Sequence, residues 1–541
     1  MGAYSNTPSY TNDEKHSFEH IKDHKLSETE SDSSAHHSHD GIFANAQWSE
    51  TTRAYSRGLL RLRLSSITHY LRKISIFLLP SFIQPYFHGG SRTSKPKALY
   101  PTSYLDGMRG LGALFVFFDH YFYTTFEVAQ GYSKIVISPP DSPTPGVQTV
   151  VYTSPWHLPF IKLLYAGPSM VCIFFVISGY ALSMRPIQLI TQRNPEALTK
   201  TLSSLVFRRI FRLYLPPIIS TLICVLLLRA GFYEYTREYT MDRRFIRYII
   251  EHHPPLLPTL SEQLRHWSTE MWNFLAVWTW DPAAGRVEYD VHLWTIPMEF
   301  RCSMVVFLLL IGTARLRRNA KFAVLAAVSW FTIRSNRWEM FLFIIGMVLA
   351  EWDVRRGAHE KWKNAVSGSL PHNDKTSVAS EDGPTSFWTL ATIPVLYLLS
   401  CPDAGADGVQ GWIYLGSLIP EWFVEKYRWW QIIGACLFVF CAARSRGWQK
   451  FFELPPVQYI GSLSYAVYLC HGPVIHIAGF AVQRYFFLRT GTEDPGYQTG
   501  AILAAFVNIP LVIWVADIFW RAVDAPTVRF AKWLEAKMSI D

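Results

Sequence analysis

The sequence predicts an all-α membrane protein, a bundle of about ten transmembrane helices behind a polar N-terminal region. Half of the 541 residues are hydrophobic and only 17% are charged, whereas about 25% of an ordinary soluble domain is charged. Apolar segments close to the roughly 20 residues that a spanning helix needs recur from residue 104 onward. The Lys and Arg residues behind the formal charge of +9 gather in the loops between these segments. That distribution is typical of membrane topology and speaks against nucleic-acid binding.

The N-terminal region, residues 1–98, lacks such segments. Residues 1 to about 50 are rich in Ser, Asp, Glu and His and hold too little apolar surface to fold, so we expect them to be disordered. Residues 57–87 alternate basic side chains with Leu, Ile and Phe, which favours an amphipathic helix at the membrane surface over a stub of a further span. The transmembrane domain then comprises residues 99–541.

The candidate spans share an apolar core and short polar ends. They are residues 104–126, 160–184, 213–231, 291–313, 321–336, 338–352, 387–401, 428–444, 459–482 and 498–520. With the N-terminus in the cytoplasm, most Lys- and Arg-rich loops fall on the cytoplasmic side, as the positive-inside rule requires. We expect the aromatic segment 232–290 to lie partly in the interface or to cover a cavity, and the polar insert 359–386 to be a flexible loop.

The seven cysteines lie in or beside apolar segments and none forms a CxxC pair. Neither a zinc site nor a disulfide framework is indicated, and we expect no metal site. The His pair at 36–37 belongs to the polar tail, where a solvated role is favoured over metal binding.

Ionisable side chains in the first span are the strongest indication of function, because such groups are costly inside a membrane. Arg109 and His120 are eleven residues apart, which places them on one helical face, roughly 16 Å apart along the axis. Asp106 falls near the same face, whereas Asp119 points about 100° away. A neutral imidazole can accept a proton from a hydroxyl near neutral pH, so His120 is a candidate general base. The alternative is a structural histidine bonded to a carbonyl.

Two further clusters carry charge into the spans. Arg209 and Arg212 share a helical face at the cytoplasmic mouth of the third span. Paired arginines suit the binding of phosphate groups, but arginines that simply flank a membrane span would explain them equally well. Glu299 lies about a third of the way into the fourth span, with His292 on the same face, and must pair with an arginine of the bundle or with a functional histidine.

The ninth span holds His471 and His476 on either side of a predicted kink at Gly472-Pro473. A histidine bonded across the kink is favoured here over a second catalytic histidine.

Taken together, these residues resemble the acyltransferase 3 family of integral-membrane O-acyltransferases. The matching segments are LDGMRGLGALFVFFDHY (105–121), FFVISGYALS (174–183), FRRIFRLYLP (207–216), LWTIPMEF (293–300) and YIGSLSYAVYLCHGP (459–473). They occur in the family's order and span residues 104–480. The N-terminal hundred residues lie outside the resemblance and look like the extension of eukaryotic members.

The family's functional residues fall on a defined set of positions in this chain. They are Arg109 and His120, the pair Arg209 and Arg212, and the motif from Trp294 to Glu299. One departure is Asp119, where the family more usually has an apolar residue.

The resemblance implies transfer of an acetyl or other short acyl group from acyl-CoA, with acetyl-CoA the first choice, to a hydroxyl of a small metabolite, glycan or lipid. His120 would act as general base, and Glu299 or Asp106 would order the charged network. Arg109, Arg209, Arg212 and Trp294 would bind the donor. Acyl-CoA is then a co-substrate, and no bound cofactor is expected. The eukaryotic look of the extension favours an internal membrane such as the endoplasmic reticulum.

A different class of function fits the same residues. A transporter or flippase of acyl groups or lipids would use intramembrane His, Asp and Arg side chains for coupling. The two readings differ in whether a new ester is formed.

Overall fold

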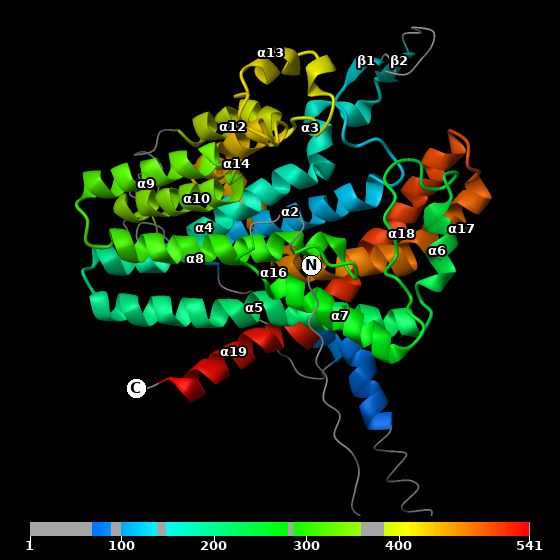
Figure 1. Ribbon diagram of the computed structural model, residues 1–541, viewed down its shortest axis with the longest axis horizontal. Coiled ribbons are helices and arrows are strands. Elements are labelled where there is room, and N and C mark those ends of the chain that lie inside the picture. The colour runs from blue at the N-terminus through cyan, green and yellow to red at the C-terminus, as the bar shows by residue number, and fades with distance from the viewer. Residues whose placement is uncertain (1–67, 88–98, 138–147, 280–284, 359–383, 540–541) are drawn as a thin grey trace, which may run out of the picture. The chain divides into compact units, whose positions relative to one another are not determined.

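The computed structural model describes residues 68–87, 99–137, 148–279, 285–358 and 384–539 (Figure 1). The predicted disorder of residues 1–50 and most of the polar insert 359–386 lie outside the described residues. The chain divides into two compact units, Met1–Ile74 and Ser75–Asp541. In the first unit, the described residues 68–74 are helical. All elements below belong to the second unit.

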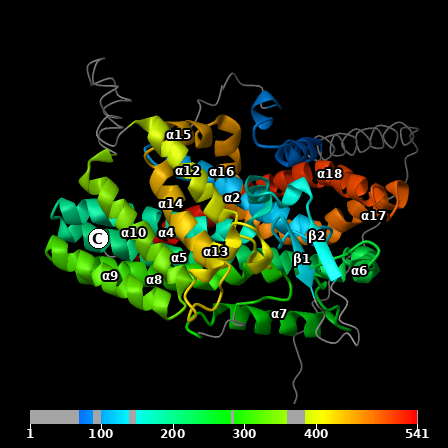
Figure 2. The same ribbon diagram turned by 90° about the horizontal axis from the view of Figure 1, so that it is seen from above.

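Ten helices in the described part of the second unit correspond to the predicted spans. They are α2 (Ser103–Phe122), α4 (Gly167–Thr191), α5 (Pro195–Arg229), α8 (Thr295–Thr313), α9 (Arg318–Arg334), α10 (Trp338–Arg355), α12 (Thr385–Leu399), α14 (Arg428–Ala442), α16 (Pro455–Val474) and α18 (Gly496–Phe519). Each predicted span overlaps one of these helices, and the all-α fold class is confirmed. Figures 1 and 2 show α9 and α10 at one end of this unit and α17 and α18 at the other.

Shorter elements connect the long helices. They are η1 (Gln84–Phe87), η2 (Pro155–His157), α3 (Pro159–Lys162), η3 (Leu163–Tyr165), α6 (Glu234–Met241), α7 (Leu260–Leu275), η4 (Val291–Trp294), η7 (Ala406–Gly408), α13 (Trp412–Ser417), α15 (Arg446–Phe452), η8 (Ile475–Gly479), α17 (Phe480–Thr490), η9 (Trp520–Asp524) and α19 (Ala525–Met538). One antiparallel hairpin joins β1 (Ser133–Ile137) to β2 (Gln148–Tyr152), with Ser133 opposite Tyr152.

The length and hydropathy of its helices indicate that this unit lies in a membrane. Within the described residues, five helical segments are long and apolar enough to cross a membrane. They are Gly167–Thr191, Pro195–Arg229, Val291–Thr313, Pro455–Thr490 and Gly496–Met538. A total of about ten spans is compatible with this arrangement and stays a prediction.

Helix α5 begins earlier than the apolar pattern predicts. The expected span starts at residue 213, but the helix starts at Pro195, where the Asn194 side chain accepts a hydrogen bond from the Ala197 amide at 3.0 Å. Asn before Pro is a strong helix start because the side chain caps a free amide and the proline ring presets the backbone. Arg209 and Arg212, predicted to share a helical face at the mouth of the span, therefore lie inside the same continuous helix as the span. The first turns of α5 are polar, so a search for apolar segments does not detect them.

The predicted irregularity at Gly472-Pro473 takes the form of a π-helical turn. Helix α16 ends at Val474 and η8 follows directly as a π-helix before α17 begins. Proline removes an amide donor from the helical ladder, and π-turns are a common way to absorb such a defect.

Two close helix crossings organise the bundle. A Cβ atom on Gly110 of α2 would lie 2.4 Å from the Gly461 backbone nitrogen of α16, and one on Gly461 would lie 2.6 Å from the Asp106 carbonyl oxygen. Likewise, a Cβ atom on Gly179 of α4 would lie 2.1 Å from the Phe343 carbonyl oxygen of α10. Backbones can approach this closely only where no side chain intervenes.

We predict that Gly110→Ala destabilises the protein, because the added methyl group would force α2 away from α16. Overpacking of this kind typically costs about 1–3 kcal/mol. The measurement is the thermal midpoint in detergent, followed by size-exclusion chromatography. Gly312→Ala in α8 is the matched control, since nothing lies within 4 Å of the added Cβ atom. Equal midpoints for the two variants would contradict the crossing.

Candidate active site

Three histidines from separate elements meet inside the bundle. His120 comes from α2, His292 from η4 and His471 from α16. The ring centroids are 4.1 Å apart for His120 and His292, 4.6 Å for His292 and His471, and 5.3 Å for His120 and His471. His292 and His471 are buried, while His120 is half-buried. Sequence analysis singled out each of these residues without placing them together.

His292 lies between two carboxylates. Its Nδ1 is 2.8 Å from Asp290 Oδ1 and its Nε2 is 2.9 Å from Glu251 Oε1. A ring nitrogen that faces an ionised carboxylate must donate, so both nitrogens carry protons and His292 is an imidazolium. Tyr468 fixes the same turn, since its hydroxyl donates to the His292 carbonyl oxygen. The position and charge of His292 are therefore held from several sides.

Glu251 continues the network beyond His292. Its Oε2 is 2.9 Å from His476 Nε2, and the Tyr123 hydroxyl donates to its Oε1. Burial on its own raises the pKa of Glu251, but the adjacent His292 and His476 rings outweigh burial and hold that pKa well below its ordinary value. Glu251 is thus a carboxylate that two imidazoles and a phenol share.

His253 ends this chain of contacts as a neutral ring. Burial, followed by the charges of His476 and Arg237, lowers the pKa of His253 to about 3. Its Nδ1 is 2.8 Å from His476 Nδ1 and its Nε2 is 3.0 Å from Thr236 Oγ1. The Thr236 hydroxyl donates to the His476 carbonyl oxygen at 2.7 Å, so its oxygen accepts from His253 Nε2.

The contacts also pair the charges of this network. His292, an imidazolium, lies between the carboxylates of Asp290 and Glu251, and His476 donates from Nε2 to the second oxygen of Glu251. Such pairing is what makes a buried cluster of charges tolerable.

The other two rings keep free nitrogen atoms. His471 Nδ1 is 2.8 Å from the Tyr468 carbonyl oxygen and 3.2 Å from that of Val467, so it donates there. Among the described residues, His471 Nε2 and His120 Nδ1 are buried without a hydrogen-bond partner. A buried nitrogen without a partner is costly unless a ligand or substrate group meets it.

The three rings are also close enough to raise the question of a metal ion. One nitrogen from each of His120, His292 and His471 lies within 4.8 Å of the others. Both nitrogens of His292 are already engaged by carboxylates, so a metal ion would have to displace Asp290 or Glu251. Only His120 and His471 offer nitrogens without partners, fewer than the three protein ligands of a usual catalytic zinc site.

The predicted charged residues form a second group. Asp106 pairs with Arg109 one turn later and accepts a hydrogen bond from the Tyr100 hydroxyl. Glu299 pairs with Arg209 at 2.7 Å, and the same arginine donates to Ser303 Oγ at 3.0 Å. Asp106 and Glu299 thus form their ion pairs with arginines, while Asp290 and Glu251 contact the histidine cluster.

Arg212 is the unpaired cation of this group. Within the described residues it has no hydrogen bond or ion pair, and its side chain is exposed. The charges of Arg109 and Arg209 act on it, together with those of Glu299 and Asp524. Arg212, Arg109 and Arg209 therefore make a basic cluster with one guanidinium free to receive an anion.

Trp294, the remaining predicted residue, follows His292 in η4. It packs against the hydrophobic core and lies 5.9 Å from the Arg428 guanidinium, measured to the ring centroid. Its aromatic ring thus anchors the turn that carries His292.

Glu251, His253 and Asp290 were missed by sequence analysis. They lie in the long segment 232–290, which was expected only to cover a cavity or lie in the interface. The run Glu251-His252-His253 and the i,i+2 spacing of Asp290 and His292 are the signals that could have found them.

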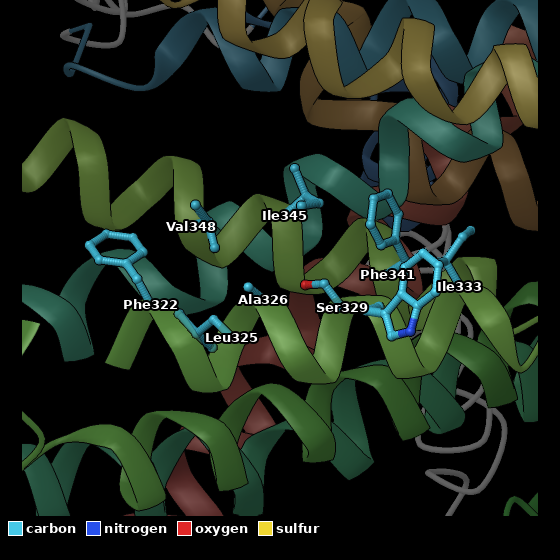
Figure 3. Close-up of a pocket in the computed structure, with 9 residues that line it drawn as sticks. Phe322, Leu325, Ala326, Ser329, Ile333, Phe341, Ile345 and Val348 are labelled. Carbon is cyan, nitrogen blue, oxygen red and sulfur yellow. The ribbon is translucent and has the colours of Figure 1, made fainter. Parts of the chain in front are cut away.

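The apolar pocket between α9 and α10 belongs to neither group (Figure 3). Its lining includes Phe322, Trp330 and Phe341 and contains no ionisable side chain. The pocket is an apolar groove between two helices and offers no ionisable group for catalysis. The histidine and arginine clusters therefore remain the candidate site.

We predict that His253 makes stability depend on acid pH. The pKa of His253 is about 3 in the folded protein, against about 6.5 in an unfolded chain. As pH falls below about 6.5, protons bind the unfolded state first, so stability is lost progressively toward pH 3. The ionisable groups facing the ring are His476, Arg237, Glu251 and Tyr233.

The measurement is the thermal midpoint between about pH 7 and pH 4.5. His253→Gln should lose less of its midpoint over this range than the unaltered protein. His252→Gln, at the exposed neighbouring position, should keep the steeper dependence. The same slope for His253→Gln as for the unaltered protein would refute the neutral assignment.

Comparison with known proteins gives one consistent picture. The pattern of the acyltransferase domain matches residues 102–521. The O-acetyltransferase PaAT-1 of Phomopsis amygdali is 30% identical over 84% of this chain and 87% of its own length. Acyltransferase R4 of a Phoma species is 25% identical over 82% and 98%, and acyltransferase clz18 of Cochliobolus lunatus is 24% identical over 79% and 94%. No solved structure matches the chain.

The match covers far more than half of the sequence and includes both clusters of the candidate site. It coincides with long apolar helices that identify an integral membrane protein. The alignments cover 87%, 98% and 94% of the relatives' own lengths, and these proteins are named as acyltransferases or an O-acetyltransferase. The chain is therefore an acyltransferase enzyme and belongs to the acyltransferase 3 family.

Proposed function

We propose that this enzyme transfers an acetyl or other short acyl group from acyl-CoA to a hydroxyl of a small metabolite, glycan or lipid. His120 is the general base. The observation that carries the proposal is the buried, unpartnered Nδ1 of His120 beside the equally unpartnered Nε2 of His471. Two imidazole nitrogens without partners in one buried place suit a reaction in which a hydroxyl proton must be accepted and later returned.

The arginine cluster supports a CoA donor. Arg109 and His120 are eleven residues apart on α2, or roughly 16 Å at 1.5 Å per residue. The arm of CoA has about thirteen bonds between phosphorus and sulfur, and an extended chain of that length spans about 15 Å at roughly 1.2 Å per bond. Phosphates held at Arg109, Arg209 and Arg212 would thus place the thioester beside His120.

The proposed reaction is a direct transfer. The acceptor oxygen attacks the thioester carbonyl carbon while its proton passes to His120, and the carbonyl π electrons move to oxygen. The oxyanion then collapses, re-forms the carbonyl and breaks the carbon–sulfur bond. The leaving thiolate takes the proton back from the His120 imidazolium. The products are an ester and free CoA, and the enzyme returns to its starting state.

Each of the other predicted residues has a place in this scheme. Asp106 and Glu299 hold Arg109 and Arg209 through their ion pairs, which orders the cluster around Arg212. Trp294 supports the donor from the η4 turn. Acetyl is the preferred acyl group because the relative from Phomopsis amygdali is named an O-acetyltransferase. The Lys- and Arg-rich loops favour a cytoplasmic N-terminus, and the eukaryotic look of the N-terminal extension favours an internal membrane such as the endoplasmic reticulum.

We predict that His120→Ala abolishes ester formation while the protein stays inserted and abundant. A general base contributes typically about 10²–10⁴-fold to the rate. Untargeted mass spectrometry of lipid, metabolite and glycan extracts compares cells carrying the intact protein with cells carrying the variant. A compound acylated only by the intact protein names both the acceptor and the acyl group.

His69→Ala, a substitution at a histidine outside the site, is the matched control and should leave the acylated compound in place. Ester formation by His120→Ala at the full rate would overturn the base assignment. Compounds that merely change sides of a membrane would instead favour the transporter reading.

A further inference from the structure

Glu251 is the one residue of the buried network that connects three of the elements around the site. Its carboxylate contacts His292 of η4, His476 of η8 and Tyr123, the residue that follows α2. These elements, with α16 immediately before η8, are the ones that carry His120, His292 and His471. Glu251 itself lies between α6 and α7, outside the long helices, and is buried. It therefore acts on the cluster from outside the helices that form it.

The contacts of Glu251 exceed what a simple structural ion pair requires. One arginine or lysine would neutralise a buried carboxylate, as Arg521 does for Asp517 in another part of the bundle. Here the carboxylate is divided between two imidazoles, and His292 receives a second carboxylate from Asp290. The arrangement fixes protons on both nitrogens of His292 and so gives that ring a permanent positive charge.

The charge of His292 lies where acyl transfer needs it. Its ring centroid is 4.1 Å from that of His120, with the planes at 66°, so the edge of one ring meets the face of the other. Negative charge develops on the carbonyl oxygen next to the base during the attack. A fixed cation on a buried ring at this distance stabilises such charge without rearranging during the reaction.

We propose that Glu251 is a positioning residue of the active site: with Asp290 it holds His292 as an imidazolium beside His120, to stabilise the oxyanion of acyl transfer. The inference rests on the proposed function and extends it to a residue of the segment between α6 and α7. Because both N–H groups of His292 are engaged, the ring acts on the oxyanion through its charge and not through a hydrogen bond.

The test uses membranes from cells that express each variant as the full chain. They are incubated with acetyl-CoA and an extract of His120→Ala cells, which contains the acceptor in its unacylated form. Product is followed by mass spectrometry between about pH 5.5 and pH 8.5. Glu251→Gln keeps the shape of the side chain and removes its charge. We expect a loss on the order of a hundredfold in kcat, with the KM for acetyl-CoA unchanged.

The pH profile separates positioning from a merely structural role. In Glu251→Gln only Asp290 remains to hold the proton of the His292 ring, so activity should fall further as pH rises. The ionisable groups around position 251 are Tyr123, Asp119, His120, Asp290, His292, His253, His471 and His476. Glu251→Asp restores the charge. It should recover much of kcat, and its activity should no longer fall as pH rises.

Glu234→Gln is the matched control, because Glu234 lies in α6 of the same connecting region, is exposed, and among the described residues pairs with Arg237 alone. It should behave like the unaltered protein. If the unaltered protein forms no ester, the proposed function fails. If it forms ester and Glu251→Gln is equally active, or loses activity evenly at all pH values without rescue by Glu251→Asp, this inference alone is refuted.

Discussion

The backbone contact between α2 and α16 is the constraint on which the site depends. Gly110 and Gly461 let the two helices touch without intervening side chains. His120 follows Gly110 by ten residues, and His471 follows Gly461 by the same number. Two helices that run in the same direction from a crossing rise together, so residues ten positions beyond the crossing lie side by side, about 15 Å from it. The distance of 5.3 Å between the ring centroids of His120 and His471 is thus a consequence of the positions of Gly110 and Gly461.

Charge balance is the second requirement, and it explains why the histidines can be buried. Isolated charges inside a membrane protein are costly. The carboxylates Asp290 and Glu251 flank the His292 imidazolium, while Asp106 and Glu299 offset arginines of the other cluster. Among the described residues, Nδ1 of His120 is one of the buried polar atoms without a partner, and the exposed guanidinium of Arg212 has no ion pair. Those two groups lie at the two ends of the proposed acyl-CoA path.

The sequence was sufficient for the fold class and for one side of the site. Helical periodicity alone put Arg109 and His120 on one face of the first span, because both lie on a single regular helix. It could not find Glu251, whose contacts arise from the path of a long connecting segment and not from any local pattern. It also placed the start of α5 too late, since its polar first turns carry no apolar signal. Contacts between distant segments, such as His292 with Glu251, require the tertiary structure.

The proposed donor path runs from the arginine cluster to the histidine cluster. The decisive experiment is a cryo-electron microscopy structure with acetonyl-CoA, an analogue whose carbonyl group cannot be transferred. We expect its phosphates to lie against Arg212 and the neighbouring arginines, and its carbonyl group to lie beside His120 and His292. Phosphates bound elsewhere, or a carbonyl that lies outside the histidine cluster while the phosphates are in place, would contradict it.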